Sequence, residues 1–170
     1  MKIYLLSLTL LGSCLGLQAQ NFSGNFESNS QYYMSSEEFG ITAPQDRLRA
    51  NNYFTLNFEM DGFTVGAQYE AYLPNGPLLG YDPTLNGNEI ATYFGTYTRD
   101  EFSVTAGYFY EEFGNGLALR SWEDRQLGLN NALKGVRVKA KLAEKIYIKA
   151  LFGKQRHGFE TSEGSLQAAD

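Results

Sequence analysis

Apolar and polar residues alternate along several stretches of this chain. Phe54, Leu56 and Phe58 fall on one side of residues 51–60, whereas Thr55 and Asn57 fall on the other. Successive side chains of a strand point to opposite faces, so this period of two indicates a β-strand with one apolar and one polar face. The abundance of aromatic residues and glycine, with 12 Tyr, 12 Phe and 18 Gly, also favours strands and turns over helices.

The alternation recurs along the chain and predicts seven strands. Asp61-Gly62 separates two of them and has the composition of a two-residue hairpin turn. In the segment 89–98 the alternation is less regular, because Ile90 and Phe94 fall on the side of the threonines. The predicted strands cover residues 22–33, 51–60, 63–72, 89–98, 102–110, 136–142 and 146–152.

The connections between these strands alternate in length. Those at 61–62, 99–101 and 143–145 are tight, whereas those at 34–47, 74–88 and 113–133 are long. In an up-and-down meander all tight turns then lie at one end and all long loops at the other, as in barrels of the bacterial outer membrane. The strand lengths also approach the ~9 to 11 residues that cross a bilayer. The sequence therefore predicts an all-β fold, an antiparallel up-and-down transmembrane β-barrel.

Closure of such a barrel needs more than seven strands. A sheet edge in lipid would carry unpaired backbone groups, and bacterial single-chain barrels have an even number of strands, at least ~8. We therefore expect residues 21–170 to hold an incomplete, N-terminal portion of the barrel. The alternative is a soluble periplasmic β-barrel binding protein or a sandwich, because the alternation is the same when the apolar side meets another sheet.

Residues 1–20 have the layout of a secretory signal peptide, with Lys2, an apolar stretch and then small or polar residues. Its removal would take away Cys14, the single cysteine, and with it any disulfide or thiolate chemistry. The alternative is a lipoprotein signal in which Cys14 is lipidated, since Leu11-Gly12-Ser13-Cys14 resembles a lipobox. The expected location is the cell outer membrane.

The segment 107–138 is the most distinctive part of the chain. It begins Gly107-Tyr108-Phe109-Tyr110-Glu111-Glu112-Phe113-Gly114-Asn115-Gly116-Leu117 and continues through Leu127-Gly128-Leu129-Asn130-Asn131 to Gly135-Val136-Arg137. With this pattern the chain resembles a family of uncharacterised outer-membrane β-barrel proteins of Bacteroidota, a domain of unknown function. The resemblance implies the location and the fold. It implies no site residue, because that family has no established activity.

The connection at 113–133 is too rich in leucine for a simple solvated loop. Folded into the mouth of a barrel, it would bury its leucines and restrict the opening. Two other interpretations stay open, namely a packed external loop with ordinary surface ion pairs and a surface that contacts a partner protein. The charged residues concerned are Arg120, Glu123, Asp124 and Arg125, and the leucines are Leu117, Leu119, Leu127, Leu129 and Leu133.

Charge is distributed unevenly along this acidic chain, whose formal net charge is −5. Basic residues gather in the segment 134–156, where four of them alternate on the polar side of two adjacent strands. A wall of this kind would attract anions. The alternative is that these cations pair with acidic residues or keep that face solvated. The four residues are Arg137, Lys139, Lys141 and Lys149.

These patterns favour an outer-membrane pore or solute-uptake protein with an inward-folding loop at 113–133. The alternative is a non-conducting outer-membrane scaffold or secretion accessory. The expected partners are outer-membrane lipid and either a small solute or another envelope protein. We expect no enzyme, because the single histidine, His157, has no recognisable catalytic context. No cofactor, metal or nucleic acid is expected either.

Overall fold

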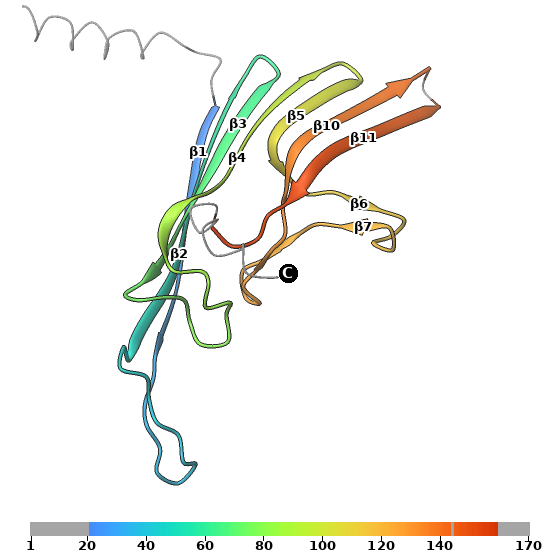
Figure 1. The fold of residues 1–170 in the computed structure, drawn as a ribbon. Coiled ribbons are helices and arrows are strands. Elements are labelled where there is room, and N and C mark those ends of the chain that lie inside the picture. The colour runs from blue at the N-terminus through green and yellow to red at the C-terminus, as the bar shows by residue number, and fades with distance from the viewer. Residues whose placement is uncertain (1–20, 144, 160–170) are drawn as a thin grey trace, which may run out of the picture.

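One antiparallel sheet dominates the computed structural model, which describes residues 21–143 and 145–159. Its seven strands are hydrogen-bonded in chain order and form the curved wall seen in Figure 1. They are β1 (Asn21–Tyr32), β2 (Leu48–Met60), β3 (Phe63–Leu73), β4 (Gly87–Arg99), β5 (Phe102–Phe109), β10 (Leu133–Leu142) and β11 (Ile146–Gln155). The prediction of an all-β meander with seven strands is confirmed. Within the described ranges the sheet is open, with β1 and β11 as its edges.

The tight turns and the long loops lie at opposite ends of the sheet (Figure 1). Asp61 and Gly62 both have positive φ, 46° and 81°, as a two-residue hairpin turn requires. Asp100 and Ala143 also have positive φ in the other two tight connections. The signal peptide expected at residues 1–20 lies outside the described residues. No helix among the described residues is long and apolar enough to cross a membrane.

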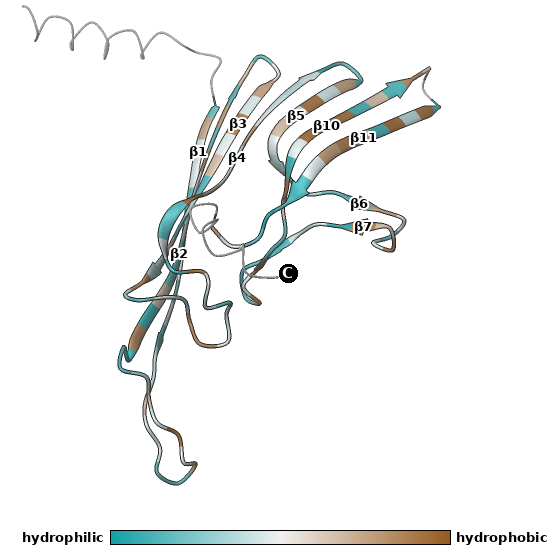
Figure 2. Ribbon diagram, viewed as in Figure 1, coloured by the Kyte–Doolittle hydropathy of each residue, from teal (hydrophilic) through white to brown (hydrophobic). Residues whose placement is uncertain are grey.

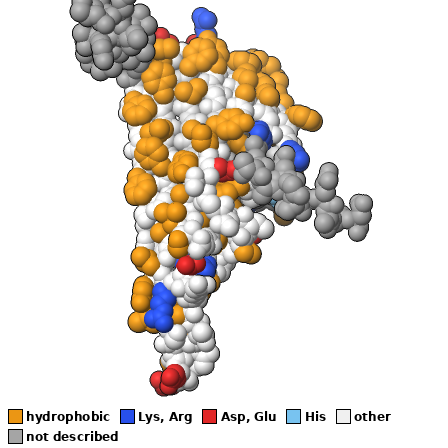
Figure 3. All heavy atoms as spheres, turned by 60° about the vertical axis from the view of Figure 1, so that its left-hand side comes forward, with side chains coloured by type: hydrophobic (Ala, Val, Ile, Leu, Met, Phe, Trp, Pro, Cys, Tyr) orange, Lys and Arg blue, Asp and Glu red, His pale blue; other side chains and the backbone are white. Residues whose placement is uncertain are grey.

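The two faces of the sheet differ in polarity. The convex face carries the apolar set of each strand, and many of its members are exposed, among them Phe54, Phe63, Val65, Tyr69, Ile90, Phe102, Val136, Ile148 and Phe152. The concave face carries the polar set, including Asn51, Thr55, Gln68, Glu70, Thr105 and Arg137. Figure 2 shows the resulting alternation of colour along the strands, and Figure 3 shows hydrophobic side chains spread over the side at β1 and β2.

A β-bulge explains the irregular alternation of β4. The register shifts between Gln68 and Tyr69 of β3, which pair with Thr92 and Ile90, so Ala91 is an extra residue in β4. The extra residue of a bulge shifts the alternation, so that side chains beyond it point to the opposite face from the one that the unbroken pattern would give. Ile90 therefore lies opposite Tyr69 on the convex face and not beside the threonines. Phe94 does lie on the concave face.

The sheet splits between β4 and β5 towards its long-loop end. These strands pair only from Phe94 with Gly107 to Arg99 with Phe102, whereas β4 stays paired with β3 as far as Gly87. Gly107 sits at the split with a φ of 103°, where any side chain would collide with the Tyr93 carbonyl. Beyond this point the backbone pairing of β4 with β5 ends, and side chains lie between the two strands.

Two small hairpins form the connection between β5 and β10. They are β6 (Glu112–Phe113) with β7 (Leu119–Arg120), and β8 (Glu123–Asp124) with β9 (Leu129–Asn130). The expectation that the leucines of this connection are buried is wrong for most of them. Leu117 is 95% exposed at the β6–β7 tip and Leu127 is 67% exposed at the β8–β9 turn, while Leu133 is buried. The turns hold Leu117 and Leu127 in exposed positions, and the hairpins contact the sheet through polar groups instead.

Candidate functional site

The β8–β9 hairpin is seated on the concave face of the sheet. Arg125, at its turn, donates to a carboxylate oxygen of Glu27 on β1 at 2.7 Å and to Oε1 of Gln68 on β3 at 3.0 Å. Its guanidinium also lies 4.8 Å from the ring centroid of Tyr53 on β2. One side chain therefore ties the hairpin to three strands.

A chain of hydrogen bonds crosses the concave face beside Arg125. Glu123 Oε1 accepts from Gln68 Nε2 at 2.7 Å and from Asn130 Nδ2 at 3.2 Å. The Tyr110 hydroxyl then donates to Asn130 Oδ1 at 3.1 Å. Gln68 belongs to β3 and Tyr110 follows β5. We call this chain, Gln68-Glu123-Asn130-Tyr110, the polar bar.

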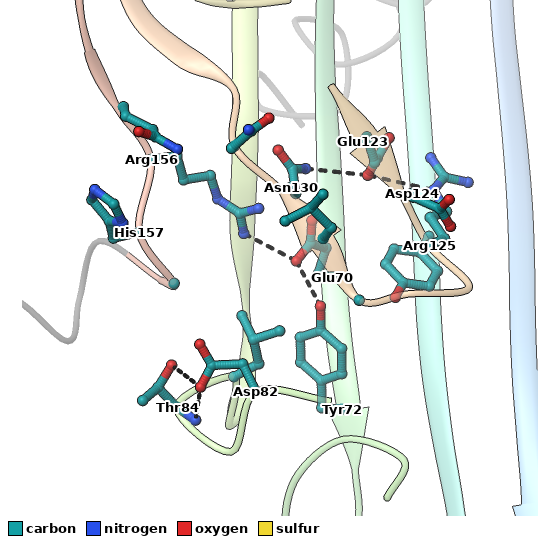
Figure 4. Close-up of a pocket in the computed structure, with 17 residues that line it drawn as sticks. Glu70, Tyr72, Asp82, Thr84, Glu123, Asp124, Arg125, Asn130, Arg156 and His157 are labelled. Carbon is teal, nitrogen blue, oxygen red and sulfur yellow. Dashed lines mark hydrogen bonds and ion pairs between the residues drawn. The ribbon is translucent and has the colours of Figure 1, made fainter. Parts of the chain in front are cut away.

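A polar cleft of about 380 Å³ lies on the long-loop side of the polar bar. Three separate parts of the chain form its walls: the loop after β3, the β8–β9 hairpin and the segment that follows β11. Figure 4 shows their side chains converging on the cleft from these three directions. The lining includes Tyr53, Glu70, Tyr72, Asp82, Thr84, Glu123, Asp124, Arg125, Asn130, Asn131, Arg156 and His157.

A buried ion pair forms the floor of the polar cleft. Glu70 is 1% exposed, and its Oε2 atom accepts from Arg156 Nη2 at 3.1 Å and from the Tyr72 hydroxyl at 2.9 Å. Gln68 Nε2 donates to the other carboxylate oxygen at 3.0 Å. A buried carboxylate needs such compensation, because desolvation of an unpaired charge is very costly. The pair joins the segment after β11 to the centre of β3.

Two carboxylates that line the polar cleft, those of Asp82 and Asp124, cap local turns. Asp82 accepts from the backbone N–H and the hydroxyl of Thr84 at 2.9 and 2.8 Å. Asp124 accepts from the backbone N–H groups of Gln126 and Leu127 at 3.0 and 3.1 Å. These bonds account for both side chains as turn formers. Among the described residues, no group of three or more His, Cys, Asp or Glu side chains is placed to hold a metal ion.

A cationic cluster surrounds Glu111, which lies between β5 and β6. Its carboxylate contacts Lys149 Nζ at 2.6 Å, Lys139 Nζ at 2.8 Å and Arg137 Nη1 at 3.2 Å. Burial by itself would raise the pKa of Glu111, but the hydrogen bonds from Lys139 and Lys149 outweigh it and lower that pKa to about 2. Three cations thus share one carboxylate, which leaves the cluster with a surplus of positive charge.

An aromatic pocket of about 320 Å³ lies on the other side of the polar bar. It occupies the concave face where β4 and β5 separate, and two members of the polar bar, Gln68 and Tyr110, belong to its wall. The remaining lining residues are Thr55, Ala67, Thr92, Phe94, Thr96, Thr105, Tyr108, Phe109 and Arg137. The polar bar therefore stands between two cavities of different character.

The structure separates the charged residues of the predicted constriction into two groups. Glu123 and Arg125 hold the hairpin to the sheet, and Asp124 caps its turn. Arg120 lies apart from them, 3.8 Å from Glu112 and 4.8 Å from the Trp122 ring, with both charged side chains about half exposed. The loop thus meets the concave face through β8–β9.

The four predicted wall cations all lie on the concave face and are paired. Arg137, Lys139 and Lys149 contact Glu111, and Lys141 lies 3.4 Å from Glu101 at the tight-turn end. The alternative interpretation, pairing with acidic residues, thus describes their contacts. Two acidic residues against four cations still leave this region positive.

Several residues that build the two cavities have no functional signature in the sequence. Tyr53, Glu70 and Asn130 were visible only as members of polar strand faces or of a loop. Arg156 lies just beyond the last predicted strand and was visible only as the last residue of the basic segment 134–156. Their roles come from contacts between positions far apart in the chain, such as Arg156 with Glu70, which no local pattern encodes.

Comparison with known proteins gives a family but no activity. The model of a family of unknown function (DUF6029) matches residues 1–170. Searches among curated proteins and among solved structures found no match. The function must therefore be argued from the geometry of the sheet and its two cavities.

Proposed function

This chain belongs to the DUF6029 family of unknown function, and we propose that its sheet is part of the wall of an outer-membrane β-barrel that takes up or passes small solutes. The polar concave face lines the solute path, and the β8–β9 hairpin restricts it. The observation that carries the proposal is the polar bar, which divides the concave face into two cavities. Lipid covers the convex face in this arrangement.

The exposed convex face supports contact with lipid. Its large apolar side chains occur on all seven strands and include Phe22, Phe63, Tyr69, Ile90, Phe102, Val136 and Phe152. Soluble monomers rarely expose contiguous apolar patches beyond a few hundred Å². A sheet with an apolar outer face and a polar inner face is the arrangement of outer-membrane barrels. The same face argues against the soluble periplasmic binding protein.

Strand length and strand edges agree with this environment. The long strands have 8 to 13 residues, around the ~9 to 11 that cross a bilayer at a tilt. Backbone groups at the edges of a sheet cannot stay unpaired in lipid. Both β1 and β11 therefore gain neighbouring strands in the assembled barrel, which closes the wall around the concave face.

The polar bar is suited to act as a constriction that can open. It consists of side-chain hydrogen bonds between neutral amides, a hydroxyl and the single carboxylate of Glu123. The bond between Tyr110 and Asn130 joins neutral groups and contributes about 0.5–1.5 kcal/mol, whereas each of the two bonds to the Glu123 carboxylate contributes about 1.5–3 kcal/mol. The Arg125 ion pair with Glu27 adds a further contact. A small number of side-chain contacts thus holds the hairpin to the wall.

Single-channel conductance of the assembled barrel in planar bilayers tests the constriction. We expect removal of residues 124–129 to raise the conductance, because it abolishes the β8–β9 turn and Arg125. Removal of residues 114–118 is the matched control, since it shortens the β6–β7 tip and leaves the polar bar intact. Absence of conductance in the wild type and in both variants would contradict the pore.

Orientation offers an independent test of the same proposal. The loop 74–88 and the β8–β9 hairpin lie at the long-loop end, and the turn at Asp61-Gly62 lies at the other (Figure 1). In a Cys14→Ser background, a membrane-impermeant thiol reagent should label Leu79→Cys on intact cells and spare Asp61→Cys, since both native side chains are exposed. Labelling of position 61 without position 79 would invert the topology.

One observation favours the second candidate, a non-conducting scaffold or secretion accessory. Leu117 and Leu127 are 95% and 67% exposed at the two hairpin tips, where a partner protein would cover them. In that case the variant lacking residues 114–118 should lose a co-purifying envelope protein. A pore would keep its conductance in the same variant, so the two functions predict different results.

A further inference from the structure

The chemistry of the aromatic pocket identifies a class of ligand. We propose that this pocket binds a small organic carboxylate with a flat apolar body, held at its charged end by Arg137. The proposal deepens the proposed function, since it names the solute class that meets the concave face. Its binding test does not depend on conductance, so the two can fail separately.

The depth of the pocket comes from the split in the sheet. Beyond the pair of Phe94 and Gly107, side chains separate β4 from β5, so a cavity can form within the wall itself. Gly66 on β3 leaves room for the ring of Phe94, because a side chain at this position would collide with it. The volume of about 320 Å³ is at the low end of the ~300 to 1,000 Å³ typical of small-ligand sites.

The lining of the pocket is aromatic with a single charge. Phe94, Tyr108, Phe109 and Tyr110 supply apolar surface, and threonines supply hydroxyl groups. Among the described residues that line the pocket, Arg137 alone is charged. Flat apolar molecules stack on aromatic rings, so this surface matches a ring or another planar body better than a polyol.

Arg137 is held in place and retains donors for a ligand. Its guanidinium donates to the Tyr110 carbonyl, the Thr105 hydroxyl and Glu111 at 3.0, 3.1 and 3.2 Å. These bonds use three of the five N–H groups of an arginine. The guanidinium also lies 5.2 Å from the Phe109 ring centroid. Such fixation is the preorganisation that a binding site requires.

Glu111 does not cancel the charge of Arg137. The shorter contacts of this carboxylate are with Lys149 and Lys139, at 2.6 and 2.8 Å, while Arg137 is at 3.2 Å. One negative charge therefore faces three positive ones, and the surplus attracts an anion. A carboxylate pairs with guanidinium through two parallel, charge-assisted hydrogen bonds, which are about twice as strong as the bonds that a neutral acceptor forms.

Equilibrium binding to the full chain, purified in a non-ionic detergent, tests the proposal. The probes are benzoate, with both features, benzamide, with the ring but no charge, and acetate, with the charge but no ring. We expect benzoate to bind at least about tenfold more tightly than benzamide or acetate, since it alone pairs with Arg137 while its ring is buried. Equal affinities for benzoate and benzamide would overturn the assignment.

Two variants locate the site. Arg137→Gln should weaken benzoate binding by about tenfold or more, because it removes the charge and the fork of donors. Thr92→Phe should also abolish binding, because its ring fills the pocket. This variant keeps Arg137 and its partners, so it tests the site even if Arg137→Gln fails to fold. Lys141→Gln is the control, since Lys141 pairs with Glu101 outside the pocket. Benzoate binding that survives both pocket variants, or no saturable binding in the wild type, would refute the site.

Discussion

Replacement of Glu111 by Gln tests the electrostatics of the concave face quantitatively. The pKa of Glu111 falls from the ordinary 4.5 to about 2, and each unit corresponds to about 1.36 kcal/mol. The full shift would contribute about 3 kcal/mol to the stability of the fold. Because the side chains of Lys139 and Lys149 are 42% and 35% exposed, solvent screening reduces the expected loss in Glu111→Gln to about 2 kcal/mol at pH 7.

The pH dependence of this loss has a definite sign. A carboxylate with a depressed folded-state pKa stabilises the protein fully above its unfolded pKa, and the contribution disappears as the pH falls through the folded value. The difference between wild type and Glu111→Gln should therefore persist down to about pH 5 and vanish by about pH 2.

Urea unfolding in detergent, followed by the fluorescence of Trp122, measures this difference at each pH. Trp122 is a suitable reporter because its neighbour Ser121 hydrogen-bonds the backbone of Glu111. Glu112→Gln is the matched control, and its exposed, 3.8 Å contact with Arg120 should contribute less than about 0.5 kcal/mol. An equal loss at pH 7 and pH 2, or no loss at pH 7, would refute the reasoning.

Two further substitutions test the packing that supports the site. Arg156→Met leaves the Glu70 carboxylate buried without its cation and should lower the free energy of unfolding in urea at pH 7 by about 3–5 kcal/mol. The double variant with Glu70→Gln should recover part of this loss, and additive losses would argue against the ion pair. Gly66→Ala places a methyl group against the Phe94 ring and should cost about 1–3 kcal/mol. Gly95→Ala is the control, because the nearest atom to the added methyl group is Val65 Cγ1 at 3.7 Å. It should change stability by much less, and equal effects of the two glycine substitutions would count against the packing described for Phe94.

Local patterns predicted the sheet well because strand periodicity is itself local. The alternation of Phe54, Leu56 and Phe58 placed β2, and Asp61-Gly62 placed its turn. The strand ends were less accurate, since β2 begins at Leu48 and β10 at Leu133, where pairing continues past the alternating residues. The sequence showed the irregular alternation of residues 89–98 but not the bulge at Ala91 that causes it. One inserted residue changes which face of the strand its neighbours occupy, and it leaves the composition of the strand unchanged.

The candidate site was only partly visible in the sequence. The leucines and charges of the loop 113–133 predicted that it folds inward, and Glu123 and Arg125 do contact the sheet. The physical reason was different from the one expected, since Leu117 and Leu127 stay exposed while polar bonds to Gln68 and Glu27 hold the hairpin. Those partners lie 55 and 98 residues away in the chain, so tertiary structure alone brings them together.

In the proposed barrel the convex face meets lipid while the concave face meets water. Two pairs of adjacent residues, one pair on β3 and one on β5, test this arrangement. They are replaced one at a time in single-cysteine variants of a Cys14→Ser chain, which are labelled with a small fluorophore and reconstituted in liposomes. We predict that brominated lipids quench the label at Val65 and Val104, and that aqueous iodide quenches it at Thr64 and Ser103. Equal quenching by iodide at all four positions, with no effect of brominated lipid, would contradict the membrane wall.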